Sequence, residues 1–458
     1  MKAIAVLLLL LCNTVVYAQE CDCRKKLDGV QVYLRKNYVG FIDKVTPLTQ
    51  QAYTAMLTKL RLQAAATKNA SHCLLLINRY LRFFKDQHLS LRGHFTPVTE
   101  TIALNPAQLE QLEKQPLSSI AGIYQLDDQR KLALVKHPKG IRSYAAVIQQ
   151  WPDQDWKPGD VLFELAATGP DKFDVINYTG HRLSFDTIMG NSLVALGWRK
   201  TGAAHGPAAA EAPAWAGVPV APYFFRQLDD STGYLRIGSF AAADYPLADS
   251  VLNTCDEYLR RNPRLVLDVR DNGAGSDKLT ERLRPLLYTQ PVRIIGADFL
   301  ATPDNISAWG HILDEQAGKL PDEYLEQVRN LIHQGESSQG RLVSMGPDEN
   351  MILPSPMAAP VKVAVIMNRK CSNTAEQFLL EAMQSQKVKL MGTATAGALD
   401  YLNVNTARFY GPDFMIDYPV TRSRRVPAGQ GIDNKGIQPV VKLDFQSPGW
   451  LDEVLKKL

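Results

Sequence analysis

The feature that most constrains the fold is an alternation of apolar strands and amphipathic helices in the second half of the chain. The alternation comprises apolar runs at residues 234–237, 265–269, 361–367 and 388–391, with helical patterns between them at residues 247–260, 277–287 and 374–384. Because strands joined through a helix lie parallel in one sheet, this alternation predicts a largely parallel sheet with helices on its faces. We expect the last part of the chain, residues 223–458, to form this α/β core.

The first half of the chain has two different characters. Residues 19–95 are predicted to be helical, because residues 71–84 carry apolar side chains at the i, i+3, i+4, i+7 spacing of a buried helix face. Residues 96–200 contain short apolar runs separated by Asp, Gly and Pro, a pattern typical of a small antiparallel sheet or barrel. Residues 201–222 are rich in Ala, Gly and Pro and are expected to form a linker or surface insertion. The whole chain is therefore predicted to be a multidomain α/β (α+β) protein.

The N-terminus carries the pattern of a secretory signal peptide. Lys2 precedes an apolar run at residues 3–11, and residues 16–18 match a small-x-small cleavage site that ends at Ala18. The apolar run is too short to span a bilayer. We therefore expect cleavage after Ala18 and a mature protein that is secreted or periplasmic, soluble and without a membrane anchor.

Cysteine usage agrees with export. The chain has six cysteines, and Cys12 would leave with the signal peptide, so the mature protein keeps Cys21, Cys23, Cys73, Cys255 and Cys371. An odd number of thiols in an oxidising compartment leaves at least one of them unpaired. Either Cys21 or Cys23 is expected to pair with Cys73, and Cys371 is expected to stay free.

Composition and motifs narrow the class of ligand. The chain of 458 residues has a formal net charge of +4 from 51 basic and 47 acidic residues, and no basic stripe runs along it. The densest basic cluster, Arg422 with Arg424 and Arg425, is interpreted as a solvated strand edge, so nucleic acid is not an expected partner. The sequence has no zinc-ligand spacing, phosphate-binding loop or dinucleotide fingerprint, so no cofactor is expected. It does not indicate an oligomeric state.

Two strand ends in the α/β core carry candidate chemistry, because ligands of such sheets bind at the carboxyl ends of strands. The first strand ends in the glycine-rich turn 271–275, whose glycines leave backbone amides exposed, as an oxyanion hole requires. The second strand leads through residues 367–376, where small polar side chains stand at a strand-to-helix junction. A nucleophile at such a junction gains support from the helix dipole.

Taken together, the motifs resemble the C-terminal-processing (tail-specific) serine peptidase family. The first strand end matches an Asp-x-Arg-x-Asn-x-Gly-Gly motif at Asp268, Arg270, Asn272 and Gly275, with Ala274 in place of the first glycine. Residues 392–397 match a Gly-x-x-Thr-x-Gly turn, and residues 431–439 resemble the closing motif of the family. The resemblance implies a mixed-sheet peptidase core that hydrolyses peptide bonds in peptide or protein substrates by acyl transfer. Backbone groups of Gly273, Gly275 and Thr374 are the candidates for its oxyanion hole.

One residue selects the branch of this family. Members with a Ser-Lys dyad carry Lys directly after the Gly-x-x-Thr-x-Gly turn, where this chain has Ala398. The chain therefore resembles the other branch, similar to the core of tricorn peptidase, which uses Ser, His and an acid. In this branch the His lies upstream in an Asp-x-His motif, which makes His88 the candidate general base. Asp433 would orient His88 and stabilise its imidazolium.

The nucleophile position departs from the family. Counting back three residues from Glu376, the family serine is replaced by Asn373, and a carboxamide cannot act as an acyl-transfer nucleophile. Ser372 is adjacent, but a displacement of about 1 Å can cost 10²-fold in rate. Three hypotheses stay open: hydrolysis through Ser372, an inactive relative that binds peptides, and a natural or engineered replacement of an active serine by Asn373.

The segment 96–200 raises a further alternative. Many family members insert a peptide-binding PDZ domain here, but the carboxylate-binding loop of such a domain is not found, so a small antiparallel sheet or barrel is preferred. Its aromatic side chains are Trp151, Trp156 and Tyr178, which are expected to form core or rim. Binding of cell-wall glycans by this segment is the alternative of a different class.

Overall fold

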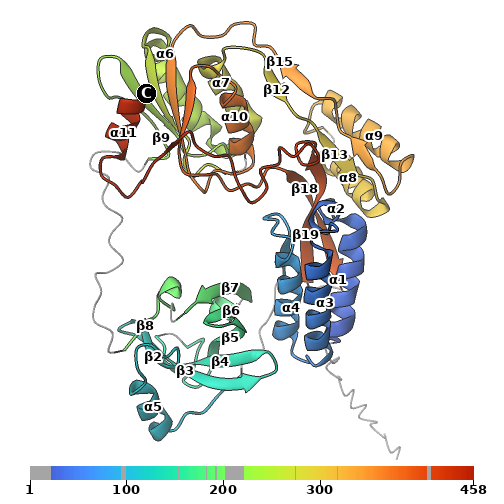
Figure 1. Cartoon of the computed structure of the whole chain (residues 1–458), viewed down its shortest axis with the longest axis vertical. Helices are drawn as coiled ribbons and strands as arrows, with labels where there is room; N and C mark the ends of the chain where they lie inside the picture. Colours follow the sequence, from blue (N-terminus) through green and yellow to red (C-terminus); the bar gives the residue numbers. More distant parts are fainter. Residues whose placement is uncertain are drawn as a thin grey trace, which may run out of the picture.

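The computed structural model describes residues 22–93, 100–152, 154–181, 183–190, 193–201, 221–273, 275–316, 318–409 and 414–458. It is a mixed α/β protein with several sheets, so the predicted fold class is confirmed (Figure 1). The predicted signal peptide at residues 1–18 and residues 202–220 of the predicted linker lie outside the described residues.

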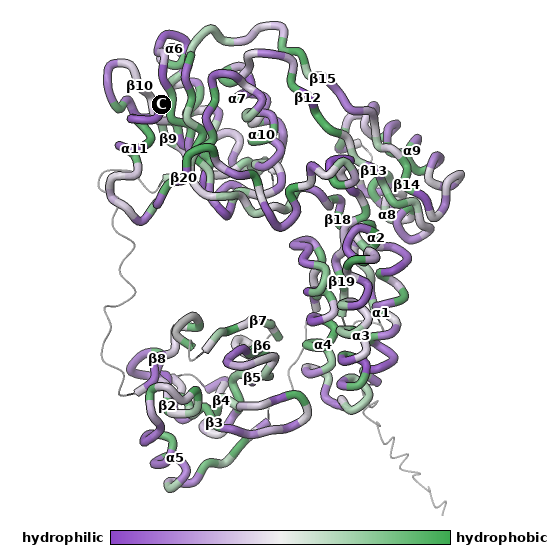
Figure 2. The backbone as a smooth tube through the Cα atoms, in the orientation of Figure 1, coloured by the Kyte–Doolittle hydropathy of each residue, from purple (hydrophilic) through white to green (hydrophobic). Residues whose placement is uncertain are grey.

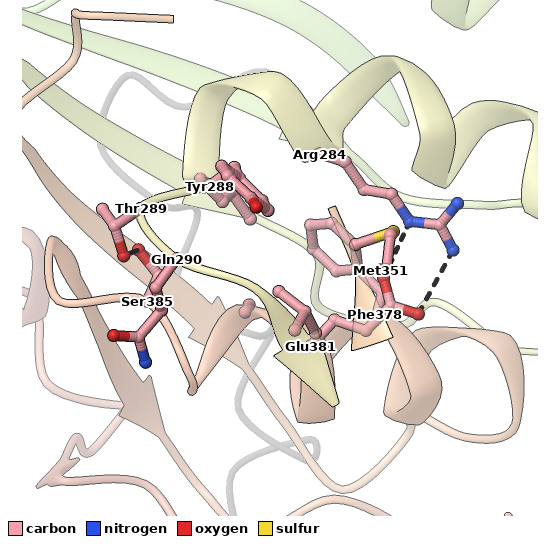
Figure 3. A pocket seen from close by; sticks show the side chains of 11 residues that line it. Arg284, Tyr288, Thr289, Gln290, Met351, Phe378, Glu381 and Ser385 are labelled. Carbon is pink, nitrogen blue, oxygen red and sulfur yellow. Dashed lines mark hydrogen bonds and ion pairs between the residues drawn. The ribbon is translucent and has the colours of Figure 1, made fainter. Parts of the chain in front are cut away.

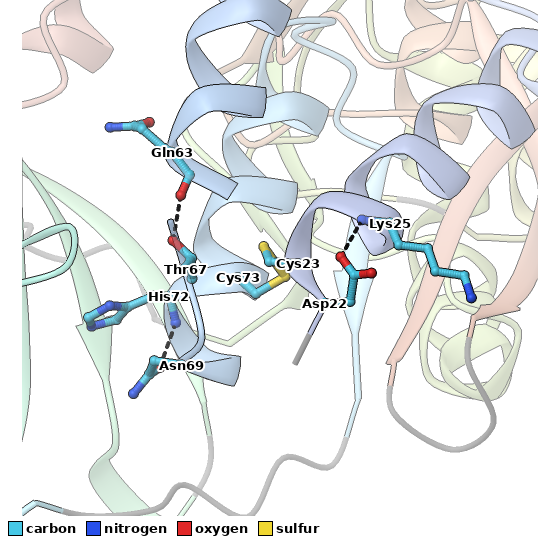
Figure 4. Close-up of a disulfide and its surroundings, with 8 residues drawn as sticks. All are labelled: Asp22, Cys23, Lys25, Gln63, Thr67, Asn69, His72 and Cys73. Atoms are coloured by element: carbon cyan, nitrogen blue, oxygen red, sulfur yellow. Dashed lines mark hydrogen bonds between the residues drawn. A yellow bond between two sulfur atoms is a disulfide. The ribbon is translucent and has the colours of Figure 1, made fainter. Parts of the chain in front are cut away.

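The N-terminal segment is helical. It contains α1 (Cys23–Asn37), α2 (Phe41–Lys44), α3 (Gln50–Ala65) and α4 (Ala70–Arg82). A disulfide joins Cys23 at the start of α1 to Cys73 in α4, with the two Cα atoms 5.3 Å apart (Figure 4). Cys21, the alternative partner, lies outside the described residues. Helix α4 leads directly to the loop that carries His88.

The middle segment forms an antiparallel sheet with its own core. Its strands, in the order β7-β6-β5-β4-β3-β2-β8, are β2 (Gly122–Asp127), β3 (Arg130–Lys139), β4 (Arg142–Gln150), β5 (Val161–Gly169), β6 (Lys172–Asn177), β7 (Ser184–Met189) and β8 (Arg199–Lys200). The segment also contains α5 (Pro106–Glu113) and two short 3-10 helices, η1 (Thr179–His181) and η2 (Leu193–Leu196). Trp156 and Tyr178 are buried in this core, as expected for structural aromatic residues.

This sheet domain docks on α4 through buried polar contacts. His72 lies 2.7 Å from Glu164 of β5, and Arg79 Nε donates to Asp174 of β6 at 2.6 Å. A buried carboxylate with such partners keeps its hydrogen bonds satisfied. The contacts fix the inserted domain against the helix that leads to His88.

The α/β core contains a six-stranded sheet in the order β20-β17-β16-β11-β10-β9. The strands are β9 (Tyr223–Gln227), β10 (Thr232–Ile237), β11 (Arg264–Asp268), β16 (Lys362–Met367), β17 (Val388–Gly392) and β20 (Val441–Lys442), and only β9 pairs antiparallel among them. One face packs against α6 (Tyr245–Arg261), α7 (Asp277–Leu287) and α10 (Thr374–Ala382). The 3-10 helix η3 (Ala242–Asp244) directly precedes α6. The other face packs against α11 (Trp450–Lys457). Figure 2 shows hydrophobic residues concentrated along these strands.

A second sheet joins distant parts of the chain. It has the order β1-β19-β13-β14, with β18 also paired to β19, and comprises β1 (Ser90–Arg92), β13 (Ala297–Leu300), β14 (Leu342–Ser344), β18 (Tyr401–Phe409) and β19 (Phe414–Ser423). Helices α8 (Pro303–Gln316) and α9 (Asp322–Glu336) lie beside it, and β12 (Val292–Ile294) pairs with β15 (Glu349–Met351). The N-terminal helices share one hydrophobic core with this sheet, which contains Tyr38, Phe299 and Tyr418.

The arginine cluster at residues 422–425 differs from its interpretation as a solvated strand edge. Arg422 and Arg425 are buried, and they form ion pairs with Asp43 at 2.8 Å and Asp400 at 3.2 Å. That interpretation was wrong, because tertiary carboxylates from distant segments neutralise these side chains. A buried guanidinium requires such partners.

Candidate active site

The two strand ends that the sequence marks lie side by side. Strands β11 and β16 are parallel neighbours, and Asp268 stands opposite Ile366 in the register. Beyond the strands the loops stay connected, because Val269 N donates to Ile366 O at 3.0 Å and Ser372 N donates to Asn272 O at 3.1 Å. The glycine-rich turn and the strand-to-helix junction therefore form one continuous backbone surface.

The Asp-x-Arg part of the first motif is a buried ion pair. Asp268 is fully buried and accepts hydrogen bonds from Arg270 Nη2 at 2.8 Å, Arg236 Nη1 at 2.8 Å and Tyr234 Oη at 2.5 Å. Burial by itself raises the pKa of Asp268, but the hydrogen bonds and charges of the two arginines outweigh it and leave that pKa below its ordinary value. Asp268 is thus ionised, and its hydrogen bonds fix Arg270 at the start of the turn.

The Asn and Gly of the same motif fix the turn by close packing. Asn272 is fully buried, where its Nδ2 donates to Ile237 O at 3.1 Å and its Oδ1 accepts from Phe240 N at 2.9 Å. A Cβ on Gly275 would lie 2.2 Å from the Phe240 carbonyl oxygen, so only glycine fits there. Both positions hold the turn against the segment that follows β10.

The candidate oxyanion donors are partly occupied. Gly275 N donates to Thr374 Oγ1 at 3.0 Å, and the same hydroxyl donates to Gly275 O at 3.1 Å. A Cβ on Gly273 would lie 3.5 Å from Ser372 Oγ, which places the Ser372 hydroxyl beside Gly273. An oxyanion role for Gly273, Gly275 and Thr374 stays a prediction, and for Gly275 it requires the Thr374 hydroxyl to release the amide.

The strained position of the junction is residue 373. Asn373 directly precedes α10 and has φ 52° and ψ −112°, a conformation that side-chain-bearing residues rarely adopt. A sharp, strained strand-to-helix turn is the geometry that exposes a nucleophile in serine hydrolases. The Oδ1 atom of Asn373 is buried and has no hydrogen-bond partner among the described residues. Asn373 thus occupies this strained turn between β16 and α10, and we call residue 373 the elbow.

Ser372 and Cys371 directly precede Asn373, and neither has its unusual backbone conformation. Ser372 is half-buried and does not have a positive φ. Cys371 is fully buried, and its Sγ lies 3.2 Å from Val269 O and forms no disulfide. Burial raises the pKa of the Cys371 thiol to about 12, so it is not a thiolate near neutral pH. The expected free thiol is therefore a packed side chain.

Glu376 organises the elbow and the neighbouring turn. It is fully buried; Oε1 accepts from Thr395 Oγ1 at 2.5 Å and Gly397 N at 2.6 Å, and Oε2 accepts from Ala398 N at 2.8 Å and Asn373 N at 3.2 Å. The sequence marks Glu376 only as part of a motif. The structure makes it the group that connects the elbow to residues 395–398.

His88 approaches this turn from the N-terminal segment. Its neighbour Gln87 donates from Nε2 to Ala396 O at 2.8 Å, which ties the loop to the turn held by Glu376. The nearest carboxylate is Asp86, whose Oδ1 lies 3.8 Å from His88 Nδ1 and accepts from His88 N at 2.9 Å. Nδ1 of His88 is buried and lacks a hydrogen-bond partner among the described residues.

Asp86 is itself held in place. Its Oδ2 accepts from Tyr38 Oη at 2.7 Å, and its side chain is 2% exposed. Burial raises the pKa of Asp86 above its ordinary value, while the hydrogen bonds from Tyr38 and the His88 amide and the charge of Lys44 oppose that rise. Asp86, which the sequence marks only as part of the Asp-x-His motif, is thus the carboxylate nearest to the His88 ring, at a distance longer than a hydrogen bond.

Asp433 has a different partner from the one expected. Its carboxylate forms an ion pair with Lys44 of α2 and accepts from Asn434 Nδ2 at 2.8 Å. Its backbone N donates to Asp400, a buried carboxylate that also accepts from Ile432 N at 2.5 Å. The role of Asp433 as the acid for His88 stays a prediction. Sequence reasoning missed Lys44 and Asp400, for which no local motif exists.

A small pocket shown in Figure 3 lies elsewhere in the core. It has a volume of about 20 Å³ and lies between α7, α10 and β12, where Arg284 Nε donates to Glu381 at 2.8 Å. This space accommodates about one water molecule. In the described ranges no three His, Cys, Asp or Glu side chains are arranged to hold a metal ion, and none of the helices there has the length and hydropathy of a membrane span.

Comparisons with known proteins concern the α/β core and the overall fold. Residues 231–443, just under half of the chain, match the family described as peptidase family S41. This range contains both strand ends, Asn373, Glu376 and Asp433, while His88 lies upstream of it. A search of curated proteins found no match.

Solved structures match the chain at low sequence identity. The crystal structure of mature CPAF is 13% identical with a TM-score of 0.51, covering 95% of this chain and 96% of that one. The structure of mature CPAF complexed with lactacystin is also 13% identical with a TM-score of 0.51, and the match covers 95% of this chain and 97% of that one. The photosystem II D1 C-terminal processing protease is 12% identical with a TM-score of 0.37, covering 93% of each chain. At this identity the CPAF structures show a likeness of fold.

Proposed function

We propose that this chain, whose residues 231–443 match peptidase family S41, is an exported serine-peptidase-like protein that binds extended polypeptides without forming an acyl-enzyme. The observation that carries the proposal is the residue at the elbow. Asn373 has the strained conformation of a nucleophile position, but its carboxamide has no hydroxyl or thiol to attack a carbonyl. Binding surfaces of the core would persist where the covalent step is absent.

Two further observations support non-catalytic binding. Asp433 is neutralised by Lys44, which leaves it less able to stabilise a protonated His88. The amide of Gly275 donates to Thr374 Oγ1, so one candidate oxyanion donor is occupied. Export is supported by the signal pattern at residues 1–18 and by the disulfide between Cys23 and Cys73, a bond typical of oxidising compartments.

A second candidate function is hydrolysis of peptide bonds through Ser372, of the C-terminal-processing type. The position of its hydroxyl beside Gly273 favours this alternative, because a candidate oxyanion amide would then lie near the nucleophile. The elbow conformation at residue 373 favours the first candidate. The two differ in which residue would react with an electrophile.

Labelling with a fluorophosphonate probe distinguishes the two candidates. We expect no labelling of the mature wild-type protein, labelling of the Asn373→Ser variant, and loss of that labelling when His88→Ala is added. Binding of a fluorescent unfolded polypeptide, followed by anisotropy, should be present in the wild type, and mass spectrometry should find the polypeptide intact.

The Ser372→Ala variant serves as the matched control. If the wild type is labelled and Ser372→Ala abolishes that labelling, Ser372 is the nucleophile and the first candidate is wrong. If the wild type binds no unfolded polypeptide, the proposed binding function is wrong whatever the labelling shows.

A further inference from the structure

An open groove begins beside the candidate site and runs between the N-terminal helices and the inserted sheet domain. It has a volume of about 760 Å³. One wall comes from α3 and α4, the other from the β5–β6 hairpin with Thr168 and Lys172, and one end from Asp86, Gln87 and Asn434. Helix α4 contacts β6 of this hairpin through the ion pairs of Arg79 and Arg82 with Asp174. We call this feature the basic groove.

The groove carries an excess of positive charge. Its cationic residues are Lys59, Arg79, Arg82, Lys85 and Lys172, and its carboxylates are Asp86 and Asp174. Both carboxylates are already engaged. Asp174 pairs with Arg79 at 2.6 Å and Arg82 at 3.0 Å, and Asp86 accepts from Tyr38 and from the backbone of His88. The chain as a whole has a formal net charge of only +4, so this surplus is local.

Several of these cations lack a partner. Lys59, Lys85 and Lys172 are exposed and form no ion pair within the part of the chain that the structure describes. Arg79 is bound to Asp174 through Nε, while its Nη2 atom is buried without a hydrogen-bond partner among the described residues. A ligand that supplies carboxylate groups would be favoured beside the three exposed lysines, where charge-assisted hydrogen bonds can form.

The rest of the lining fits a polypeptide. Met56, Leu60, Phe83 and Leu89 add apolar surface to the groove, which suits aliphatic side chains between acidic ones. The end formed by Asp86 and Gln87 flanks His88, and Gln87 contacts the turn that Glu376 holds. A chain that leaves the elbow past His88 would therefore enter the groove.

We propose that the basic groove binds an acidic stretch, rich in Asp and Glu, of the polypeptide held at the elbow; this inference rests on the proposed function. The recognition is electrostatic and takes place at an open surface. It is therefore sensitive to salt, because charges at such surfaces are screened over about 10 Å at 0.1 M ionic strength.

The test uses the mature full-length protein and two fluorescein-labelled peptides. One peptide has an apolar half and a half in which Glu alternates with Ala; the other has Gln in place of every Glu. The groove variant combines Lys59→Glu with Lys172→Glu. The control variant combines Lys136→Glu with Lys157→Glu, two exposed lysines of the inserted sheet domain that do not line the groove.

By fluorescence anisotropy at low salt, we expect the wild type to bind the Glu peptide about tenfold more tightly than the Gln peptide. The groove variant should lose that preference, the control variant should keep it, and added salt should reduce it. Equal binding of both peptides to the wild type, or equal losses in both variants, would overturn the inference while leaving the proposed function intact.

Two other outcomes are informative. If neither peptide binds the wild type, the inference and the proposed function are both overturned. If a single-stranded oligothymidylate binds the wild type as tightly as the Glu peptide, and only the groove variant loses that binding, the groove is a nucleic-acid site and the inference is wrong.

Discussion

The two sides of the candidate site are built in different ways. The elbow side, residues 268–275 and 368–376, follows neighbouring strands of one parallel sheet. The histidine side, residues 85–89 and 431–434, is assembled from the two ends of the chain, through contacts such as Gln87 with Ala396 and Lys44 with Asp433. The elbow side keeps the hydrogen bonds of Glu376 and those between its two loops, although residue 373 carries no nucleophile. The scaffold of such a site and its chemistry can therefore change independently.

Glu376 connects the two sides of the candidate site. Its carboxylate joins the elbow to residues 395–398, and Gln87 of the histidine side contacts Ala396 of that turn. Glu376 thus stands where the two sides meet. Three variants test how far each side depends on its own contacts.

The largest effect is expected for Glu376→Gln. A carboxamide presents an NH₂ group toward backbone donors, so buried N–H groups lose their acceptor. We expect the free energy of unfolding to fall by about 3–5 kcal/mol in urea denaturation. Hydrogen exchange should increase in both the elbow and the His88 loop.

The matched control is Glu453→Gln, an exposed position in α11, which should change stability by no more than about 0.5 kcal/mol. If Glu376→Gln and Glu453→Gln have similar effects, Glu376 does not connect the two sides.

The next effect is expected on the histidine side alone. Replacing Cys23 and Cys73 together by serine removes a cross-link between residues 50 positions apart. The unfolded chain then gains entropy, and stability should fall by about 3–4 kcal/mol. Hydrogen exchange should rise in residues 23–92 before it rises in the elbow peptides.

Reductant provides the control for this variant. It should destabilise the wild type and leave the double variant unchanged. Equal loosening of the elbow and the histidine side would show that the two do not depend on separate contacts.

The smallest effect is expected at the elbow itself and has the opposite sign. Asn373 has φ 52° and ψ −112°, which glycine adopts without steric cost. Relief of this strain, less the greater chain entropy that glycine adds to the unfolded state, should raise the free energy of unfolding of Asn373→Gly by about 1 kcal/mol.

The neighbouring variant Ser372→Gly should instead lower stability, because Ser372 does not have a positive φ. Thermal unfolding of both variants checks the pair. A stability loss for Asn373→Gly equal to that of Ser372→Gly would show that the elbow stores no strain.

Much of the elbow side could be predicted from the sequence. The strands at residues 265–269 and 361–367 and the helix at residues 277–287 follow from local hydrophobic periodicity, and adjacent parallel strands bring their ends together. The replacement of the family serine by Asn373 is also visible in the sequence, because the serine of the motif stands three residues before Glu376.

The partners of Asp433 and Arg422 could not be predicted in this way. Lys44 and Asp43 lie near the other end of the chain from the groups they neutralise, and no motif joins them. The interpretation of Arg422 and Arg425 as solvated failed for the same reason, since their burial depends on a sheet assembled from distant segments.

The sequence by itself determined the α/β core, the helical N-terminal segment, the antiparallel insertion and the absence of a hydroxyl at residue 373. These features depend on local patterns of hydrophobicity and on single residue types. Only the tertiary structure decided that the backbone is strained at residue 373, that Lys44 forms an ion pair with Asp433, and that a basic groove opens beside His88. Those features depend on contacts between segments far apart in the chain, whose ion pairs and buried hydrogen bonds exist only after the separate elements have packed together.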